Sequence, residues 1–273
     1  MNLERTDRTN WSTLKYIGKS PKLYLHRLTV PRKDTDALKL GRVTHTAIYE
    51  PELFKGRYAV MPRFHGGCND DTAIEKGYEG GKQAKLAWEA THADHEQVTT
   101  DDYTAAWGMA EALHADPIAA PLVTGGTVEK GIEWTDAETG VECRGRVDRT
   151  GAGLSDLKTT QSIHGFMRDI ARYQYHGQMA FYYDGLVANG VPQTDRPCIV
   201  AVEKAAPYDV LVVEFSDEDL AAGRELYRSC LRRLVECRTT GLWPGVSGGQ
   251  RVPLVLPDWA RPRVELTMGG VAI

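Results

Sequence analysis

The sequence predicts an α/β protein in which a mixed central β-sheet is flanked by helices. Up to about residue 117, apolar residues recur mostly at the three-to-four-residue spacing of amphipathic helices. From Thr127 the pattern changes to an alternation with a period of two, which is typical of strands with one buried face. Helical segments and further apolar strands follow as far as Cys237. This order is expected of layered α/β folds, in which helices cover the faces of a sheet.

Composition narrows the class of protein further. The 42% hydrophobic and 26% charged residues are ordinary for a soluble globular chain, and 273 residues suffice for one large domain. No apolar run approaches the roughly 20 residues that span a bilayer, and the first residues lack the apolar core of a signal peptide. The five cysteines are scattered without a CxxC pair. We therefore expect reduced thiols in a cytoplasmic protein with no membrane association and no cysteine-held metal.

The first elements are predicted to be helices. Residues 10–28 indicate two short helices, and the second begins where Pro21 follows a serine cap. Residues 35–54 form a clearer helical pattern, which Pro51 ends and which places His45 on its polar stripe.

A loop over residues 61–71 separates these helices from two more. The segments 73–92 and 101–117 are predicted to be helices, the first weakened by three glycines.

Strands follow in the second half of the chain. Residues 127–134 and 141–148 alternate in polarity, and a turn containing Asp and Gly joins them as a hairpin. A glycine-rich turn leads to a third, shorter strand. The remaining predicted elements are a helix over 164–186 that breaks into two pieces, strands over 197–207 and 208–215, and an amphipathic helix over 217–237.

The chain is predicted to be a single domain, 1–273. Its parts are a mainly helical N-terminal region, 1–115, a core of sheet and helices, 116–240, and a tail rich in Gly and Pro, 241–273.

Charge is unevenly distributed along the chain. Residues 1–42 contain ten Lys and Arg against four Asp and Glu, a formal charge of +6, whereas the remainder carries −10. A basic segment on an acidic body could bind phosphates, since local charge sets the field at a surface, but it could equally be a solvated helical surface. The candidate DNA-binding residues are Lys15, Lys19, Lys22 and Arg42.

Carboxylates gather on the three central strands. Asp156 and Lys158 stand two residues apart and therefore share a strand face. Asp148 ends the preceding strand, and Glu129 and Glu133 lie on one face of the strand before it. Pairing these strands as a meander could bring the acids and the lysine into one patch.

Crowded carboxylates repel one another unless they share a proton or bind a hard cation. Mg²⁺ suits such oxygen ligands, and a neighbouring lysine can orient water or stabilise charge on a phosphate. The competing interpretation is a set of cross-strand salt bridges without catalytic meaning.

Several segments resemble motifs of known protein families, and they follow one another along the chain in the families' order. "GRVDRTGAGLSDLKTT" resembles the core motif of the PD-(D/E)XK nuclease superfamily, although Val147 stands where its proline would be. "LKLGRVTHTAIYEPE" and "QYHGQMAFYYDGL" resemble the histidine motif and the Gln-x-x-x-Tyr helix of RecB-like nucleases. "STLKYIGKSPKLYLHR" resembles the N-terminal segment of phage and prophage RecE-type exonucleases. The resemblance implies the restriction-endonuclease-like core fold, with a helical basic N-terminal region added to it.

The resemblance also implies roles for individual residues. Asp148 and Asp156 match the metal-binding acids, and Lys158 matches the catalytic lysine. Leu157 would offer its backbone carbonyl to the metal, and His45 would approach it from the N-terminal helix.

Three further positions match less closely. Glu129 resembles the acid of the first core strand, with Glu133 as its rival on the same face. Gln178 and Tyr182 lie one helical turn apart, so both can face the site, although amphipathic packing explains the same spacing.

The function implied by the resemblance is hydrolysis of linear double-stranded DNA by a Mg²⁺-dependent 5′→3′ exonuclease, with Mn²⁺ as a substitute. A RecE-type enzyme would act at duplex ends beside a single-strand annealing protein in recombination, and would form a homo-oligomer, often a ring. Two alternatives stay open. One is a RecB-like or CRISPR-associated nuclease of other polarity or strand preference, and the other is a catalytically silent DNA-binding module.

Overall fold

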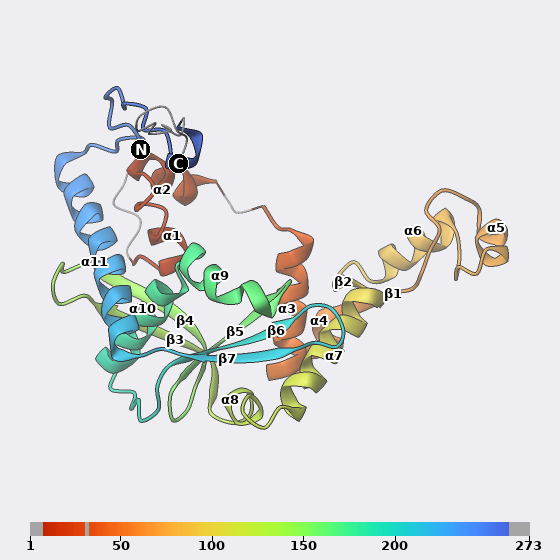
Figure 1. Ribbon diagram of the computed structural model, residues 1–273. Coiled ribbons are helices and arrows are strands. Elements are labelled where there is room, and N and C mark those ends of the chain that lie inside the picture. The colour runs from red at the N-terminus through yellow and green to blue at the C-terminus, as the bar shows by residue number, and fades with distance from the viewer. Residues whose placement is uncertain (1–7, 31–32, 262–273) are drawn as a thin grey trace, which may run out of the picture.

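The computed structural model describes residues 8–30 and 33–261 and is built around a five-stranded mixed sheet (Figure 1). The strand order is β3-β4-β5-β6-β7; β5 and β6 are parallel, and the other neighbours are antiparallel. The fold class predicted from the sequence is confirmed. The strands are β3 (Thr127–Thr135), β4 (Glu142–Thr150), β5 (Leu154–Thr160), β6 (Cys198–Glu203) and β7 (Val210–Glu214).

Helices bury both faces of this sheet. Along β6, Ile199 and Ala201 belong to one hydrophobic core, whereas Cys198, Val200 and Val202 belong to the other. Adjacent residues of a strand point to opposite faces, so this alternation shows that β6 is covered on both sides. The first core includes residues of α1 (Trp11–Leu14), α2 (Pro21–Thr29), α9 (Phe166–Arg172), α10 (Tyr175–Ala188) and α11 (Asp217–Thr240), and the second those of α3 (Asp36–Tyr49), α7 (Thr100–Ala115) and α8 (Ala120–Val123).

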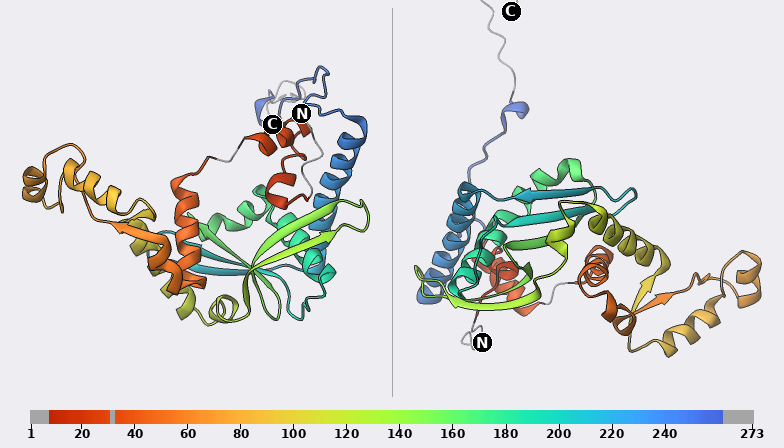
Figure 2. Two further views of the ribbon diagram at one scale, coloured as in Figure 1. Left: turned by 180° about the vertical axis from the view of Figure 1, so that it is seen from behind. Right: turned by 90° about the horizontal axis from the view of Figure 1, so that it is seen from below.

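The sheet is split between β4 and β5. These strands pair only at Arg149↔Ser155 and Thr150↔Leu154 and then diverge. Figure 2 shows the β3–β4 hairpin turning away from the other three strands. Part of the edge that β5 leaves open is taken by Thr9, whose N–H donates to the Glu142 carbonyl at 2.9 Å. The split therefore exposes the middle of β4 at a point where backbone pairing is interrupted.

Part of the N-terminal half projects from the body as an arm, at the right of Figure 1. Its base is a two-stranded parallel sheet of β1 (Tyr58–Met61) and β2 (Glu96–Thr99), which the sequence did not predict. The helix expected over 73–92 is instead two helices, because Gly77 adopts a φ of +80° that ends the first. The short helices of this region are α4 (Phe54–Arg57), α5 (Asp70–Glu75), α6 (Lys82–Thr91) and the 3₁₀ turn η2 (Pro51–Leu53).

The break expected within residues 164–186 is confirmed. Helix α9 ends before Gln174, whose φ of +60° redirects the chain, and α10 begins at Tyr175. The new direction brings α10 across β3, β4 and β5. Two more 3₁₀ turns complete the secondary structure, η3 (Ile163–Gly165) and η4 (Asp258–Ala260).

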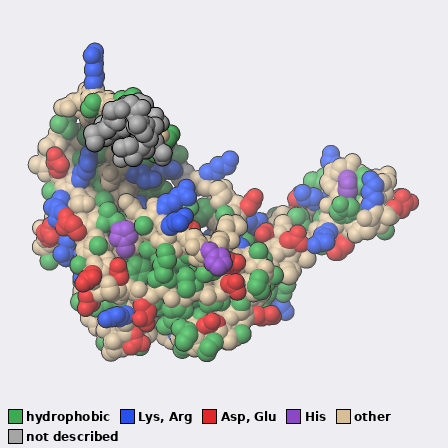
Figure 3. Space-filling model, in the orientation of Figure 1, with side chains coloured by type: hydrophobic (Ala, Val, Ile, Leu, Met, Phe, Trp, Pro, Cys, Tyr) green, Lys and Arg blue, Asp and Glu red, His purple; other side chains and the backbone are tan. Residues whose placement is uncertain are grey.

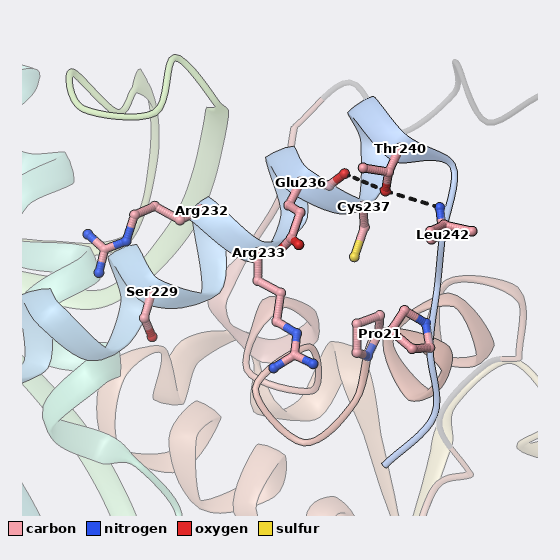
Figure 4. Close-up of a pocket in the computed structure, with 9 residues that line it drawn as sticks. Pro21, Ser229, Arg232, Arg233, Glu236, Cys237, Thr240 and Leu242 are labelled. Carbon is pink, nitrogen blue, oxygen red and sulfur yellow. Dashed lines mark hydrogen bonds between the residues drawn. The ribbon is translucent and has the colours of Figure 1, made fainter. Parts of the chain in front are cut away.

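The C-terminal segment returns to the N-terminal helices. Gly241, with a φ of +70°, ends α11, and the chain then runs beside α2. There the Lys22 N–H donates to the Pro244 carbonyl at 3.1 Å, and the Tyr24 and Trp243 rings stack at 6.0 Å. Between these segments lies a cavity of about 390 Å³ into which Arg233 points (Figure 4). Among the described helices, none is both long enough and apolar enough to cross a membrane.

Candidate active site

Asp148 lies where the sheet splits. It follows Val147 on β4, one residue before the last ladder pairs with β5. Its Oδ2 accepts a hydrogen bond from the Leu157 N–H at 3.0 Å. A side-chain carboxylate thus takes the place of the missing backbone partner and leaves the other oxygen, Oδ1, available in the split.

Glu129 is brought beside Asp148 by the β3–β4 register. The pairs on either side, Val128↔Arg149 and Lys130↔Val147, place Glu129 opposite Asp148. The backbone is locally distorted there, because Glu129 has a φ of +52° and forms no regular ladder pair. Strained backbone conformations often accompany functional sites, where surrounding structure holds them in place.

His45 completes a group of three from α3. Its Nε2 lies 3.2 Å from Glu129 Oε1 and 3.8 Å from Asp148 Oδ1. One potential ligand atom from each side chain falls within 4.8 Å of the other two, and no other such group occurs within residues 8–30 and 33–261. The Tyr49 ring, one turn further along α3, packs on the imidazole in a T-shaped arrangement, with the ring centroids 4.6 Å apart.

The chemistry of this group fits a divalent cation. His45 Nε2 is buried and makes no hydrogen bond, although a buried polar atom ordinarily has a partner. Burial lowers the pKa of His45, an effect that outweighs the opposing charge of Glu129, so the imidazole is neutral as a metal ligand must be. Burial likewise raises the pKa of Asp148, which marks the cost of holding a carboxylate there without a cation.

Asp156 and Lys158 form a second layer of the site on the α10 side. Asp156 is 1% exposed; its Oδ1 accepts from Gln178 Nε2 at 3.0 Å, and its Oδ2 accepts from Lys158 Nζ. Burial raises the pKa of Asp156 to about 6, against the lowering effect of the Lys158 charge. For Lys158, burial lowers the pKa, but the charges of Asp156 and Asp148 outweigh it and keep the ammonium protonated.

The surroundings of Lys158 restrict its movement. Its Nζ lies 5.1 Å from the centre of the Tyr175 ring and 3.5 Å from the Leu157 carbonyl oxygen. An ammonium held between a carboxylate and an aromatic face is positioned by charge and by the ring quadrupole. The charge of Lys158 also acts on Asp148, where it opposes the rise in pKa caused by burial.

Gln178 and Tyr182 both project from α10 toward the split, but they contact different residues. Gln178 reaches Asp156 directly. Tyr182 packs against Gly145 of β4, where an added Cβ would lie 2.9 Å from the ring. Burial raises the pKa of Tyr182 to about 12, so the phenol stays neutral. A contact between α10 and β4 this close requires the glycine.

The structure groups the expected metal ligands differently from the sequence hypothesis. His45, Glu129 and Asp148 come together, whereas both oxygens of Asp156 are engaged by Gln178 and Lys158. The Leu157 carbonyl lies near Lys158, and its side chain fills the core on the α3 side.

The rival acid, Glu133, lies further along β3. It pairs with Arg8 at 2.9 Å and is not part of the group of three.

The expected DNA-binding residues fall into two places. Lys15, Lys19 and Lys22 belong to the α1–α2 region. Arg42, on α3, is engaged by Asp34 at 2.8 Å and Glu96 at 2.6 Å beside the active-site cleft. The basic segment predicted as one unit also includes residues 1–7 and 31–32, which lie outside the described residues.

Two residues at the site were not singled out from the sequence. Arg146 contacts Glu129, and its position two residues before Asp148 on the same strand face was the available signal. Tyr175 supplies the ring beside Lys158 and carried no signal, because only the break before α10 places it there.

A cleft of about 340 Å³ opens beside the group of three on the α3 side. Besides His45 and Glu129, its lining includes three arginines: Arg42, Arg57 and Arg146. Cationic side chains next to a cation site are what a polyanion needs, since they can hold phosphates flanking the one at the metal.

Comparison with known proteins agrees with this geometry. The fold is similar to the crystal structure of a protein from Eubacterium rectale described as a "putative exonuclease", at a TM-score of 0.61 and 10% identity over 94% of this chain and 96% of that one. A search of curated proteins gives no match. Residues 10–252 match the family model described as "PDDEXK-like domain of unknown function (DUF3799)". With most of its length matched, the chain belongs to this PDDEXK-like family.

Proposed function

We propose that the protein is a metal-dependent exonuclease that hydrolyses phosphodiester bonds of linear double-stranded DNA. The observation that carries the proposal is the group formed by His45, Glu129 and Asp148, with the protonated Lys158 nearby. A salt-bridged surface hairpin, the competing interpretation, gives no reason for a histidine of another helix to lie against two carboxylates of its strands.

His45, Glu129 and Asp148 would hold the cation, and Asp156 would join them on releasing Lys158. We propose Mg²⁺, with Mn²⁺ as a substitute, because two carboxylates and one imidazole suit both ions. When bound, the cation would polarise the scissile phosphate and make water a better nucleophile at neutral pH.

Three residues around the cation site would each have a separate role. Lys158 would hold the attacking water and offset charge on the phosphate, because its ammonium is protonated and lies beside the carboxylates. Gln178 would keep Asp156 oriented through its 3.0 Å hydrogen bond. Tyr182 would exclude water from the α10 side by packing on Gly145. The products would be a 5′-phosphate and a 3′-hydroxyl.

The direction of degradation and the cellular role are proposed from the RecE-type resemblance. We propose 5′→3′ degradation that leaves 3′ single-stranded tails, in the cytoplasm of a bacterial or phage-infected cell. A single-strand annealing protein would receive these tails, and copies of this chain would assemble around the duplex as a homo-oligomer, in the ring form that the RecE-type resemblance implies.

A panel of substrates tests the proposal. Linear duplex, closed circular duplex and single strands, labelled at the 5′ or the 3′ end, are incubated with Mg²⁺, Mn²⁺, Ca²⁺ or excess chelator. We expect loss of the 5′ label from linear duplex with Mg²⁺ or Mn²⁺ and none with chelator. Ca²⁺ should bind without supporting turnover, since it is larger and accepts irregular coordination.

Each alternative gives a different pattern. Cleavage of circular duplex or preferred loss of the 3′ label would favour a nuclease of another type. DNA binding without cleavage in any metal would favour a silent module. Full activity in excess chelator would remove the cation site from the mechanism.

A further inference from the structure

Arg146 reaches into the cation site from the exposed face of β4. Its Nε contacts Glu129 Oε2, while the other oxygen of that carboxylate, Oε1, lies 3.2 Å from His45 Nε2. The Arg146 side chain is 74% exposed, whereas that of Glu129 is 27% exposed. Glu129 is therefore shared between a guanidinium on the solvent side and the group of three on the inner side.

A divalent cation and the guanidinium compete for the same carboxylate. Two positive groups at one carboxylate repel each other, and a guanidinium contact offsets the charge that would attract the cation. Separating an exposed arginine from its carboxylate partner costs little free energy, because water hydrates the guanidinium and surface ion pairs contribute little to stability. Arg146 is thus suited to leave Glu129 when a cation arrives.

The structure also provides room for that movement. Gly131 is the register partner of Arg146 on β3, and a Cβ placed on Gly131 would meet nothing within 4 Å. No side chain therefore covers Arg146 on the strand beside it. Arg144 follows on the same face of β4, two residues further from Asp148, which is about 6.8 Å along an antiparallel strand. The face thus presents a row of two guanidinium groups leading away from the cation site.

We propose that Arg146 is a positioning residue with two alternating partners. It holds Glu129 while the cation is absent, and it binds a backbone phosphate of the DNA strand being cut once the cation takes Glu129. Arg144 binds the next phosphate along. This inference rests on the proposed function, because it assigns the strand face that receives the substrate.

Two affinities test the exchange, and the proposal requires them to move in opposite directions. Mn²⁺ affinity is measured calorimetrically without DNA, and affinity for a short linear duplex is measured by fluorescence anisotropy in Ca²⁺. Arg146→Ala should tighten Mn²⁺ binding about fivefold, because the competing charge is gone. It should weaken duplex binding about fivefold and lower the salt slope by roughly one. Arg146→Lys should fall between the parental protein and Arg146→Ala in both.

Two control variants isolate the contact with Glu129. Arg144→Ala removes the same charge from the same strand face and should weaken duplex binding while leaving Mn²⁺ affinity unchanged. Arg232→Ala removes a salt-bridged arginine, 46% exposed, on α11, where its partners are Glu138 and Glu225, and should change neither affinity. Because Arg146 is exposed, its variants should keep the parental melting temperature.

The outcomes separate this inference from the proposed function. Unchanged or weaker Mn²⁺ binding in Arg146→Ala, or unchanged duplex binding, would overturn the exchange while a parental protein that binds Mn²⁺ and degrades DNA keeps its function. A parental protein that neither binds Mn²⁺ nor degrades linear duplex would overturn both.

Discussion

At the scale of single residues, the site depends on how each carboxylate is partnered. Asp148 replaces a missing backbone partner at the Leu157 N–H, and Asp156 is held by Lys158 and Gln178. His45 Nε2 is left without a hydrogen bond. His45 therefore has a ring nitrogen free to bind a ligand, whereas the charges of Lys158 and Asp156 offset each other.

Lys158 provides the sharpest separation of chemistry from binding. Lys158→Ala should lower the cleavage rate at least about a hundredfold, the usual scale for losing a group that moves protons or stabilises charge. Duplex affinity should stay close to the parental value, and Mn²⁺ binding should be kept or tightened, because the lysine is not a ligand and its loss frees Asp156. Single-turnover cleavage of linear duplex, measured beside both affinities, checks this.

Lys158→Arg distinguishes positioning from charge. The guanidinium keeps the charge but is planar and bulkier than the ammonium that lies between the Tyr175 ring and Asp156. We expect the arginine variant to stay badly impaired. Recovery of most of the activity would reduce Lys158 to a salt-bridge partner, and parental activity in Lys158→Ala would remove it from the mechanism.

The ionised Asp148 side chain should lower the stability of the folded protein when no cation is bound. Burial raises the pKa of Asp148, so the folded state binds its proton more tightly than the unfolded chain. Stability therefore falls as pH rises from the ordinary carboxyl range through the raised pKa, and the cost is fully present above it. In excess chelator at pH 7.5, Asp148→Asn should melt at a higher temperature than the parental protein.

The same variant should gain nothing from Mn²⁺, which should raise the melting temperature of the parental protein. The difference between the two proteins in chelator should shrink on acidification. A lower melting temperature for Asp148→Asn in chelator at pH 7.5 would show that the carboxylate is structural.

At the scale of elements, α10 positions the catalytic face and is itself positioned by α11. The helices cross so closely that a Cβ on Gly223 would lie 2.3 Å from the His176 carbonyl oxygen. Asp184 of α10 accepts from Tyr227 Oη at 2.7 Å and from Arg224 Nε at 2.8 Å, which fixes the crossing. Gln178 and Tyr175 lie on this helix, so its placement determines the surroundings of Asp156 and Lys158.

Two helical glycines make a matched test of this crossing. Gly223→Ala should lower the free energy of unfolding by about 2 kcal/mol, because the methyl group meets backbone that cannot yield cheaply. Gly41→Ala on α3 should raise it by about 0.5–1 kcal/mol, since a Cβ there meets nothing within 4 Å. Chemical denaturation of both variants checks the pair. A neutral Gly223→Ala would mean that the crossing is looser than the structure shows.

The sequence predicted some of these elements and their pairing, but not how the strands diverge. Residues spaced two apart placed Asp156 with Lys158, the alternating strands gave the β3–β4 hairpin, and the family resemblance implied the mixed sheet. The pattern could not show that β4 and β5 pair at only two positions, because divergence depends on the twist of the whole sheet. The sequence therefore could not show that His45, Glu129 and Asp148 form one group while Asp156 lies against Lys158 and Gln178.

The choice between Glu129 and Glu133 was similarly beyond the sequence. Both lie on one face of β3, and only the register opposite Asp148 distinguishes them. The β1–β2 pair was missed because its strands are four residues each and lie 34 residues apart, so no local pattern marks them.

At the scale of the whole molecule, charge is arranged around the site. On the face shown in Figure 3, Lys and Arg side chains gather in the upper half of the body beside a hollow. The N-terminal helices α1 and α2 contact α11, and Lys22 of α2 is bonded through its N–H to the Pro244 carbonyl of the C-terminal segment. The net charge of −4 therefore conceals a local field that favours a polyanion.

The lysines of the N-terminal helices should contribute to duplex affinity through phosphate contacts. Replacing Lys15, Lys19 and Lys22 together with alanine should weaken duplex binding and lower its salt slope by up to roughly three. The matched control replaces Lys76, Lys82 and Lys85 on the projecting arm, where the slope should not change. Binding isotherms at a series of salt concentrations check both variants. Equal slopes for all three proteins would make the N-terminal segment a solvated surface.

The central claim is that the split between β4 and β5 holds a catalytic cation, and anomalous diffraction from crystals soaked in Mn²⁺ tests it most directly. The account predicts a peak within coordination distance of His45 Nε2 and Asp148, with Glu129 turned toward it and away from Arg146. A protein that degrades DNA while its crystals show Mn²⁺ bound elsewhere, or none at this position, would contradict it.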